Sequence, residues 1–241
     1  QTTKAFTDYF GTFGFAFAKV DAVPEIDREN NRVALVLQSD PSRRAYVRKV
    51  NISGNNKTRD EVLRREFRQL EASWYDGDKI KLSRDRVDRL GYFTDVNIEI
   101  QEVPGSPDQV DLIVTLTEKP TGSLTVGAGF SSAERVSLSF GIKQENVFGS
   151  GNYLGIDVNT SKYNRTFVLS TTNPYFTADG ISRTLDLYHR SSKPYQDQGG
   201  NYELVTQGAS VRFGVPFSET DTVFFGALQT TTEENRVGFL R

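Results

Sequence analysis

Several residue types that carry chemistry are scarce in this sequence. Its 241 residues include no cysteine, no methionine and one histidine. Without cysteine the chain has no disulfide framework, no thiolate metal site and no cysteine nucleophile. The single histidine, His189, falls at the end of a predicted strand, where a loop position explains it better than a role as a catalytic base. Because methionine is absent, we expect that the chain does not contain its own translation start.

Long apolar runs and an excess of one charge are also absent. No segment approaches the roughly 18 to 20 apolar residues that a membrane helix needs. The strands of a membrane β-barrel need only about 9 to 11 alternating residues, so a barrel remains possible. Lysine and arginine total 29 against 31 aspartates and glutamates. This balance predicts that nucleic acid is not a partner.

Motifs that hold phosphates, metals or catalytic nucleophiles are not found. Gly127-Ala128-Gly129 and Gly149-Ser150-Gly151 resemble phosphate-binding loops in composition. Neither follows a strand and opens a helix, as a phosphate cradle requires. The sequence therefore predicts no enzyme, no cofactor and no metal site.

The first part of the chain alternates between helical and strand periodicity. Residues 1–13 predict a helix, and residues 15–23 and 32–38 predict two strands. Asp40-Pro41-Ser42 marks a linker. We interpret residues 1–41 as the rear part of an α/β domain.

Residues 43–119 predict a complete α/β domain in the order β-α-α-β-β. A strand over 47–52 precedes a helix that Thr58 and Glu61 would open as a capping box. Leu63, Phe67 and Leu70 would share one face of that helix. A second helix over 80–90 would stop at Gly91, and strands over 96–101 and 110–116 would follow. At least one edge of such a small sheet is expected to be free.

Residues 120–241 lose helical periodicity. Leu124, Val126, Ala128 and Phe130 alternate with small or polar residues, and the pattern resumes after a turn over 131–134. The whole segment predicts seven antiparallel strands. In a soluble sandwich the apolar side of such strands meets a second sheet, whereas in an outer-membrane barrel it meets lipid.

Three details favour lipid. Aromatic residues lie near predicted strand ends, as an interfacial girdle would place them: Tyr153, Tyr163, Tyr175, Phe176 and Tyr188. The opposite face is dominated by small polar residues. Arg183 interrupts the apolar face only near the start of its strand, where a basic side chain can reach the interface.

Several segments, in order, carry a resemblance to a known family. They are Arg44–Val50, Val62–Glu66, Arg89–Phe93, Val103–Asp111 and Thr172–Thr177. With the domain order, they make the chain similar to the BamA family, the central subunits of the bacterial outer-membrane β-barrel assembly machinery. The resemblance implies polypeptide-transport-associated (POTRA) domains of the α+β class followed by part of an antiparallel transmembrane β-barrel. Residues 1–41 would end one POTRA domain, 43–119 would form the next, and 120–241 would begin a sixteen-stranded barrel, here incomplete at about seven strands.

The resemblance also implies a function and its residues. Such proteins fold and insert β-barrel clients into the outer membrane without nucleotide hydrolysis. The first barrel strand would form one edge of a lateral gate, here Gly122, Ser123, Leu124, Thr125, Val126, Gly127, Ala128, Gly129, Phe130 and Ser131. The implied partners are accessory outer-membrane lipoproteins, unfolded clients, periplasmic chaperones and the lipid bilayer.

The helix segment over 64–71 would dock an accessory lipoprotein, with Arg64 and Glu71 as charge partners. An internal ion pair on a solvated helix face is the alternative for these two residues. Two other functions stay open: a two-partner secretion pore, which shares the POTRA and barrel plan, and a soluble periplasmic scaffold of α/β units and a sandwich.

Overall fold

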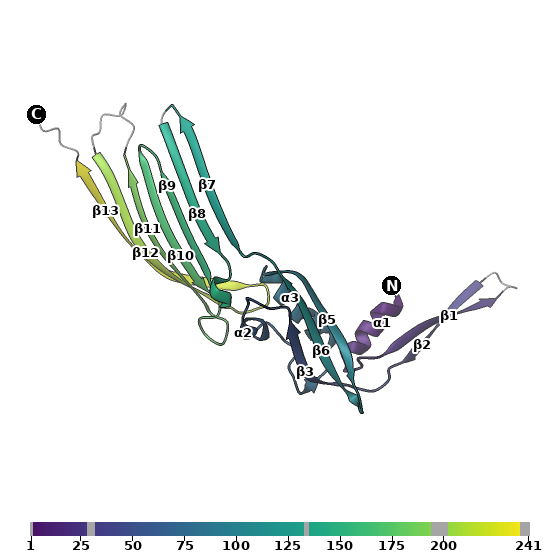
Figure 1. The fold of residues 1–241 in the computed structure, drawn as a ribbon. Coiled ribbons are helices and arrows are strands. Elements are labelled where there is room, and N and C mark those ends of the chain that lie inside the picture. The colour runs from purple at the N-terminus through teal and green to yellow at the C-terminus, as the bar shows by residue number, and fades with distance from the viewer. Residues whose placement is uncertain (1, 28–31, 133–134, 194–201, 237–241) are drawn as a thin grey trace, which may run out of the picture. The chain divides into compact units, whose positions relative to one another are not determined.

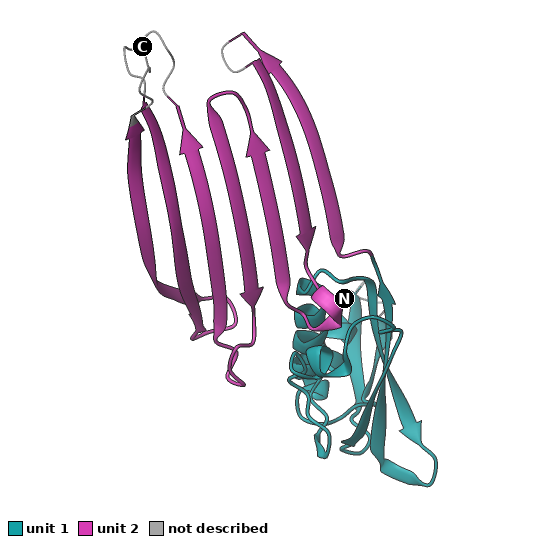
Figure 2. Cartoon of the chain, turned by 60° about the vertical axis from the view of Figure 1, so that its left-hand side comes forward, with its two compact units in different colours: residues 1–119 teal, residues 120–241 magenta. Residues whose placement is uncertain are grey.

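The structure is a computed structural model that describes residues 2–27, 32–132, 135–193 and 202–236. The chain forms two compact units, residues 1–119 and residues 120–241 (Figure 2). Within the described residues, no helix is both long and apolar enough to span a membrane.

The first segment of unit 1 is a helix followed by a β-hairpin. α1 (Thr2–Gly11) precedes β1 (Lys19–Asp27), which pairs antiparallel with β2 (Arg32–Asp40) (Figure 1). The predicted order is confirmed, but β1 begins four residues later than expected. The amide of Phe15 bonds back to the carbonyl of Phe10, and Gly14 has φ +96°. The chain therefore stays in turns after the helix instead of extending at once.

The rest of unit 1 has the predicted β-α-α-β-β order. Its main elements are β3 (Tyr46–Ser53), α2 (Asp60–Arg64), α3 (Gly77–Arg89), β5 (Phe93–Val103) and β6 (Ser106–Glu118). A two-residue strand, β4 (Ser73–Trp74), was not predicted. The sheet order is β4-β3-β6-β5, with β3 and β6 parallel and β5 antiparallel to β6.

The predicted capping box is wrong. α2 begins at Asp60 after Arg59, with no side-chain cap, and it has only five residues. Glu118 accepts hydrogen bonds from the amides of Lys57 and Thr58 at 2.9 and 2.7 Å, which holds this turn in place of a cap. Because the helix is short, Leu70 lies beyond it and is exposed, although Leu63 and Phe67 are buried as expected.

The core of unit 1 lies between the two helices and one face of the sheet. Val110, Leu112 and Val114 of the central strand β6 are fully buried and meet Leu63 of α2 and Val87 of α3 in one cluster. Helix α3 is capped by the Asp76 carboxylate, which accepts from the amides of Asp78 and Lys79. Gly91 ends it with φ +72°, as predicted.

Unit 2 contains one antiparallel sheet of seven strands in sequence order. The strands are β7 (Gly122–Ser131), β8 (Arg135–Gln144), β9 (Tyr153–Thr160), β10 (Asn164–Asn173), β11 (Ser182–Ser192), β12 (Tyr202–Pro216) and β13 (Thr222–Arg236), with a short 3-10 helix, η1 (Val147–Gly149), between β8 and β9. Figure 1 shows them side by side. The described residues of unit 2 form one sheet, whereas a sandwich needs two.

Arg48 joins the two parallel strands of unit 1 by an ion pair. It lies where the β3–β6 register shifts between Val47 and Lys49. Its guanidinium donates to both carboxylate oxygens of Asp111, at 2.9 and 2.5 Å. These hydrogen bonds and the positive charge of Arg48 lower the pKa of Asp111, although partial burial opposes them.

Truncating the core should destabilise unit 1 strongly. We expect Leu63→Ala to lower the free energy of unfolding by about 2–5 kcal/mol, because it leaves a cavity where no solvent reaches. Leu70→Ala, at an exposed position, is the control and should change it by less than about 0.5 kcal/mol. Urea unfolding in detergent, followed by the fluorescence of Trp74, the single tryptophan, measures both. Equal effects would contradict the packing described.

The Arg48–Asp111 pair should stabilise the fold only while Asp111 is ionised. Because folding lowers its pKa, the stabilisation is complete above the unfolded value of about 3.9 and disappears as the pH falls through the lower folded value. We expect the stability difference between wild type and Arg48→Gln to stay constant from about pH 7 to 5 and to shrink below about pH 4. A difference that grew on acidification would contradict this assignment.

Candidate functional site

The sheet of unit 2 has two chemically different faces. The apolar face is defined by Leu124, Val126, Ala128 and Phe130 of β7 and the residues paired with them across the sheet. The polar face is the opposite side. Val126 and Phe130 are 73% and 80% exposed. Such a broad exposed apolar surface is unusual for a soluble protein and is what a lipid-facing sheet requires.

The apolar residues of this face lie at different positions along the first strand, β7, and the last strand, β13. On β7 they centre on Gly127, whose row in the sheet runs through Ser139, Asn159, Thr166, Arg190 and Thr206 to Thr232. On the same face of β13 the apolar residues are Val223, Phe225 and Ala227, while Phe224 and Leu228 lie on the opposite face.

The band is therefore displaced along the strands. On β13 the apolar residues centre on Phe225. The row that starts at Gly127 of β7 reaches β13 at Thr232. The two positions differ by seven residues, from 225 to 232, and β7 and β13 are six strand steps apart. At about 3.3 Å per residue and about 4.8 Å between strands, this offset corresponds to a strand tilt of roughly 40°. Barrel strands tilt by about 35–45° in a membrane. The chemistry of one face thus reproduces the geometry of a barrel wall crossing a bilayer.

On the polar face, one carboxylate is held by hydrogen bonds from neighbouring strands. The Asp186 carboxylate accepts hydrogen bonds from the hydroxyls of Ser170 at 2.5 Å and Ser210 at 3.0 Å. Gly127 and Gly129 lie opposite Ser139 and Ser137, whose hydroxyls approach within 2.3 and 2.8 Å of where a Cβ atom would stand. A larger residue on β7 would push these serine hydroxyls aside.

The predicted aromatic girdle is wrong for two residues. Tyr188 is paired with Val168 and Gly208 on the polar face, in the middle of β11, and its hydroxyl lies 2.6 Å from that of Thr230. Tyr153 opens β9 but shares that face with Gly155. The alternation of side chains along the strand places both rings on the polar face. Proximity to a strand end does not determine the face.

Arg183 lies on the apolar face near the start of β11, as predicted. It is paired with Phe213, and its guanidinium stacks over the ring of Phe176 at 4.2 Å. This cation–π contact accounts for a charge at the margin of the apolar band.

Strand β7 is an edge strand. In the described part of the chain it pairs only with β8. Every second residue of an edge strand directs its backbone N–H and C=O groups away from the sheet. The ten predicted gate residues, Gly122–Ser131, make up this edge strand, and alternate ones direct their backbone groups away from β8; in the described part of the chain β13 is the other edge.

The β3 edge of unit 1 is covered by side chains where β4 ends. Glu71 accepts a hydrogen bond from the amide of Val50 at 2.9 Å, and Arg64 donates to the carbonyl of Val50 at 3.2 Å. Arg64 also pairs with Glu71 at 3.3 Å and with Asp60 at 2.5 Å. The internal ion pair considered for Arg64 and Glu71 is therefore present. The same two side chains also bind the backbone groups of Val50 at the sheet edge. Both side chains remain about half exposed.

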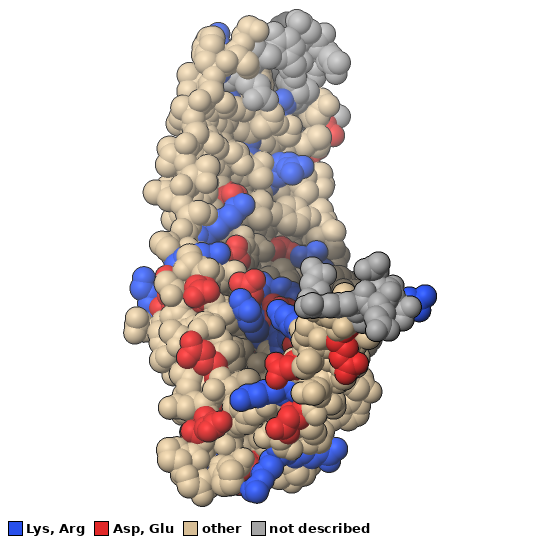
Figure 3. Space-filling view, turned by 90° about the vertical axis from the view of Figure 1, so that its right-hand side faces the viewer, with Lys and Arg blue, Asp and Glu red and all other residues tan. Residues whose placement is uncertain are grey.

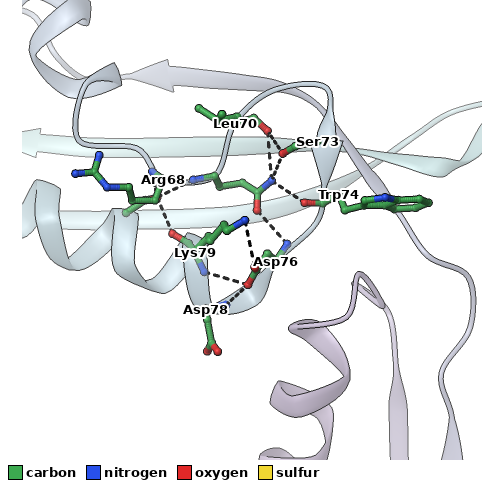
Figure 4. Close-up of polar contacts among 9 residues, drawn as sticks. Arg68, Leu70, Ser73, Trp74, Asp76, Asp78 and Lys79 are labelled. Atoms are coloured by element: carbon green, nitrogen blue, oxygen red, sulfur yellow. Dashed lines mark hydrogen bonds and ion pairs between the residues drawn. The ribbon is translucent and has the colours of Figure 1, made fainter. Parts of the chain in front are cut away.

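The turn that presents Glu71 is held by a buried glutamine that the sequence analysis missed. The Gln69 side-chain amide donates to the carbonyl of Trp74 at 2.9 Å and to Ser73 Oγ at 2.8 Å. Its carbonyl accepts from the amide of Asp76 at 3.0 Å. Figure 4 shows the partner residues Ser73, Trp74 and Asp76 at this turn. An isolated glutamine carries no sequence signal for such a role, because its partners are backbone groups.

Charged side chains do not gather by sign on the face drawn in Figure 3, where acidic and basic residues are intermixed. In the described ranges, no group of three or more histidine, cysteine, aspartate or glutamate side chains could hold a metal ion.

Comparison with known proteins finds a family match in each of the two units. The POTRA family, described as "Surface antigen variable number repeat", matches residues 45–119, and the Omp85 superfamily domain matches residues 146–237. The chain belongs to the Omp85 superfamily. It is an outer-membrane protein whose POTRA domain lies in the periplasm.

Individual relatives agree. The outer membrane protein assembly factor BamA of Neisseria meningitidis is 41% identical over 90% of the chain, and that of Nitratidesulfovibrio vulgaris is 32% identical over 92%. The chain spans 27% of the length of each of these relatives. The resemblance to the BamA family is confirmed.

Solved structures show the same fold. BamA from Haemophilus ducreyi lacking POTRA domains 1–3 has a TM-score of 0.83 and 32% identity, covering 98% of this chain and 44% of that one. CdiB from Escherichia coli has a TM-score of 0.57 at 18% identity, and this likeness concerns the fold alone. The predicted fold class, POTRA followed by barrel strands, is confirmed.

Removing the Glu71 carboxylate should open the β3 edge. We expect Glu71→Ala to destabilise unit 1 by about 1 kcal/mol and to speed hydrogen exchange of the Val50 amide about five-fold, because that donor loses its acceptor. Glu61→Ala is the control, since Glu61 pairs only at long range with exposed Arg59, at 3.5 Å. NMR measurement of the exchange rate of the Val50 amide in both variants tests this prediction. An unchanged rate at Val50 in Glu71→Ala would refute the capping role.

Proposed function

We propose that this chain is part of a protein that folds β-barrel proteins and inserts them into the outer membrane, without nucleotide hydrolysis. The observation that carries the proposal is the edge of β7, which is unpaired in the described residues, at the side of a sheet with an exposed apolar face. The names of the relatives, outer membrane protein assembly factors, support it.

The physical problem that such a protein solves is backbone desolvation. A client strand that enters lipid without partners leaves each N–H and C=O group unsatisfied, at a cost of several kcal/mol per group. An edge strand already at membrane depth supplies those partners before the client leaves water. β7 offers ten residues for this purpose, about the length that a barrel strand needs.

Gly122–Ser131 would then be one edge of a lateral gate. Gly127 and Gly129 weaken the strand, because glycine loses more entropy on ordering and packs no side chain. A weak edge suits a seam that must open and close.

Unit 1 would serve recognition in the periplasm. We assign 1–41 to the end of one POTRA domain, 43–119 to the next, and 120–241 to the start of the barrel. Arg64 and Glu71 are our candidates for docking an accessory lipoprotein, since both remain half exposed while capping Val50. Periplasmic chaperones and unfolded clients would be further partners.

A two-partner secretion pore, which shares the POTRA and barrel plan, is the second candidate; the likeness to CdiB, at 18% identity, concerns the fold alone. That likeness is weaker in both identity and TM-score than the likeness to BamA. We therefore favour the insertase.

Direct templating by β7 can be tested by cysteine crosslinking. In the full-length protein, single cysteines are placed along Gly122–Ser131 and in one strand of a barrel client stalled during assembly. We expect disulfides at successive positions in a fixed antiparallel or parallel register, because strand pairing aligns residues one by one. Cysteines at Leu138 and Phe140 of β8, which are already paired on both sides, are the control.

Normal client assembly without any crosslink to β7 would rule out templating by this edge. Crosslinks of equal yield on β7 and β8 would mean that the client contacts the wall without pairing.

A further inference from the structure

The apolar face contains a hollow across β10 to β13. Its volume is about 460 Å³, and Leu169, Leu185, Leu187, Ala209, Val211 and Ala227 are among the side chains that line it. All six project from the apolar face, since they fall in the two adjacent apolar rows of the sheet register.

Two alanines create this hollow. Ala209 of β12 stands between Leu187 and Gln229, and Ala227 of β13 is paired with Val211. In the same two rows β11 carries Leu187 and Leu185. The missing side-chain volume at two diagonal positions leaves a depression that larger residues surround.

A second hollow of about 450 Å³ continues the first. It shares Leu187, Ala209 and Gln229 with the first and adds, beside Phe167, Tyr188 and Gly208, the polar residues His189, Gln207 and Thr231. These last three residues form one row of the sheet. The hollow is therefore apolar at one end and carries imidazole, amide and hydroxyl groups at the other, four residues or about 13 Å further along the strands.

The polar end points away from the periplasm. β7 begins at Gly122, three residues after the POTRA match ends at residue 119, so the start of β7 is on the periplasmic side. β11 and β13 run in the same direction as β7. His189 lies near the end of β11, and Thr231 lies nine residues after the start of β13. The polar end thus lies toward the external leaflet.

We propose that this groove binds a glycolipid of the external leaflet, with an acyl chain over Ala209 and Ala227 and a sugar head group at His189, Gln207 and Thr231. The order of apolar and polar groups along the groove matches the orientation of such a lipid in the membrane. Among the described residues that line the polar end there is no lysine or arginine. Amide, imidazole and hydroxyl groups pair with sugar hydroxyls, whereas phosphate recognition relies on lysine and arginine side chains.

The experiment uses the full-length protein in phosphatidylcholine nanodiscs. Two photoactivatable probes carry the same diazirine-bearing alkyl tail, one with a maltose head group and one with phosphocholine. We expect the maltoside to label residues 185–187, 209–211 and 227 at least five-fold more than the phosphocholine probe, mapped by mass spectrometry.

Filling the hollow supplies the matched variants. Ala209→Leu and Ala227→Leu should each reduce maltoside labelling there at least five-fold, and Ala227→Val serves if the larger residue prevents folding. Val158→Leu adds volume to the same face outside both hollows and should leave labelling unchanged. His189→Leu with Gln207→Leu should remove the preference for maltoside. Heat-modifiable migration on gels verifies that each barrel is folded.

Three results would overturn the proposal. They are uniform labelling around the apolar face, unchanged labelling in the folded alanine variants, or equal labelling of the groove by the phosphocholine probe. None of them bears on client assembly, so the groove can fail while the insertase proposal stands.

Discussion

The backbone of a strand in lipid must find hydrogen-bond partners within the protein, because the bilayer core offers none. This constraint explains why unit 2 is a single antiparallel meander in which each interior strand is paired on both sides. It is also the reason that we propose a role for β7, one of the two end strands of the described sheet. An edge that is only a liability in a soluble sheet becomes, at membrane depth, a site of strong demand for a partner strand.

In unit 1, by contrast, side chains bind backbone groups at an edge of the sheet. Where β4 ends, Arg64 and Glu71 occupy the carbonyl and amide of Val50, and Gln69 holds the turn that positions Glu71. Side chains there replace a missing strand, at a position also suited to docking a partner. In the described residues, side chains thus cover part of one edge in unit 1, whereas β7 has no partner on its outer side. Both choices follow from the cost of an unpaired backbone group in each solvent.

Much of the fold could be predicted from periodicity. The alternation of Leu124, Val126, Ala128 and Phe130 with small residues predicted β7 and its apolar face, and the β-α-α-β-β order emerged from the change of period alone. The prediction failed where a contact between distant residues decided the local structure. Thr58 looked like a cap, but Glu118, sixty residues later, binds its amide. Tyr188 looked interfacial, but the register of β11 turns it inward. Glu71 capping Val50 and the hollow at Ala209 and Ala227 exist only once the strands are paired, so a sequence pattern could not reveal them.

The central claim is that the apolar face of unit 2 meets lipid along strands tilted by roughly 40°. Spin labels placed singly along β7 and β13 of the full-length protein in bilayers test it most directly, through their accessibility to oxygen and to a water-soluble nickel chelate. The account predicts that oxygen accessibility alternates with a period of two on both strands. It also predicts that the zone of high oxygen accessibility centres on Gly127 in β7 and on Phe225 in β13, although Gly127 shares its row with Thr232. Zones centred on the same row of the sheet, or no alternation on either strand, would contradict it.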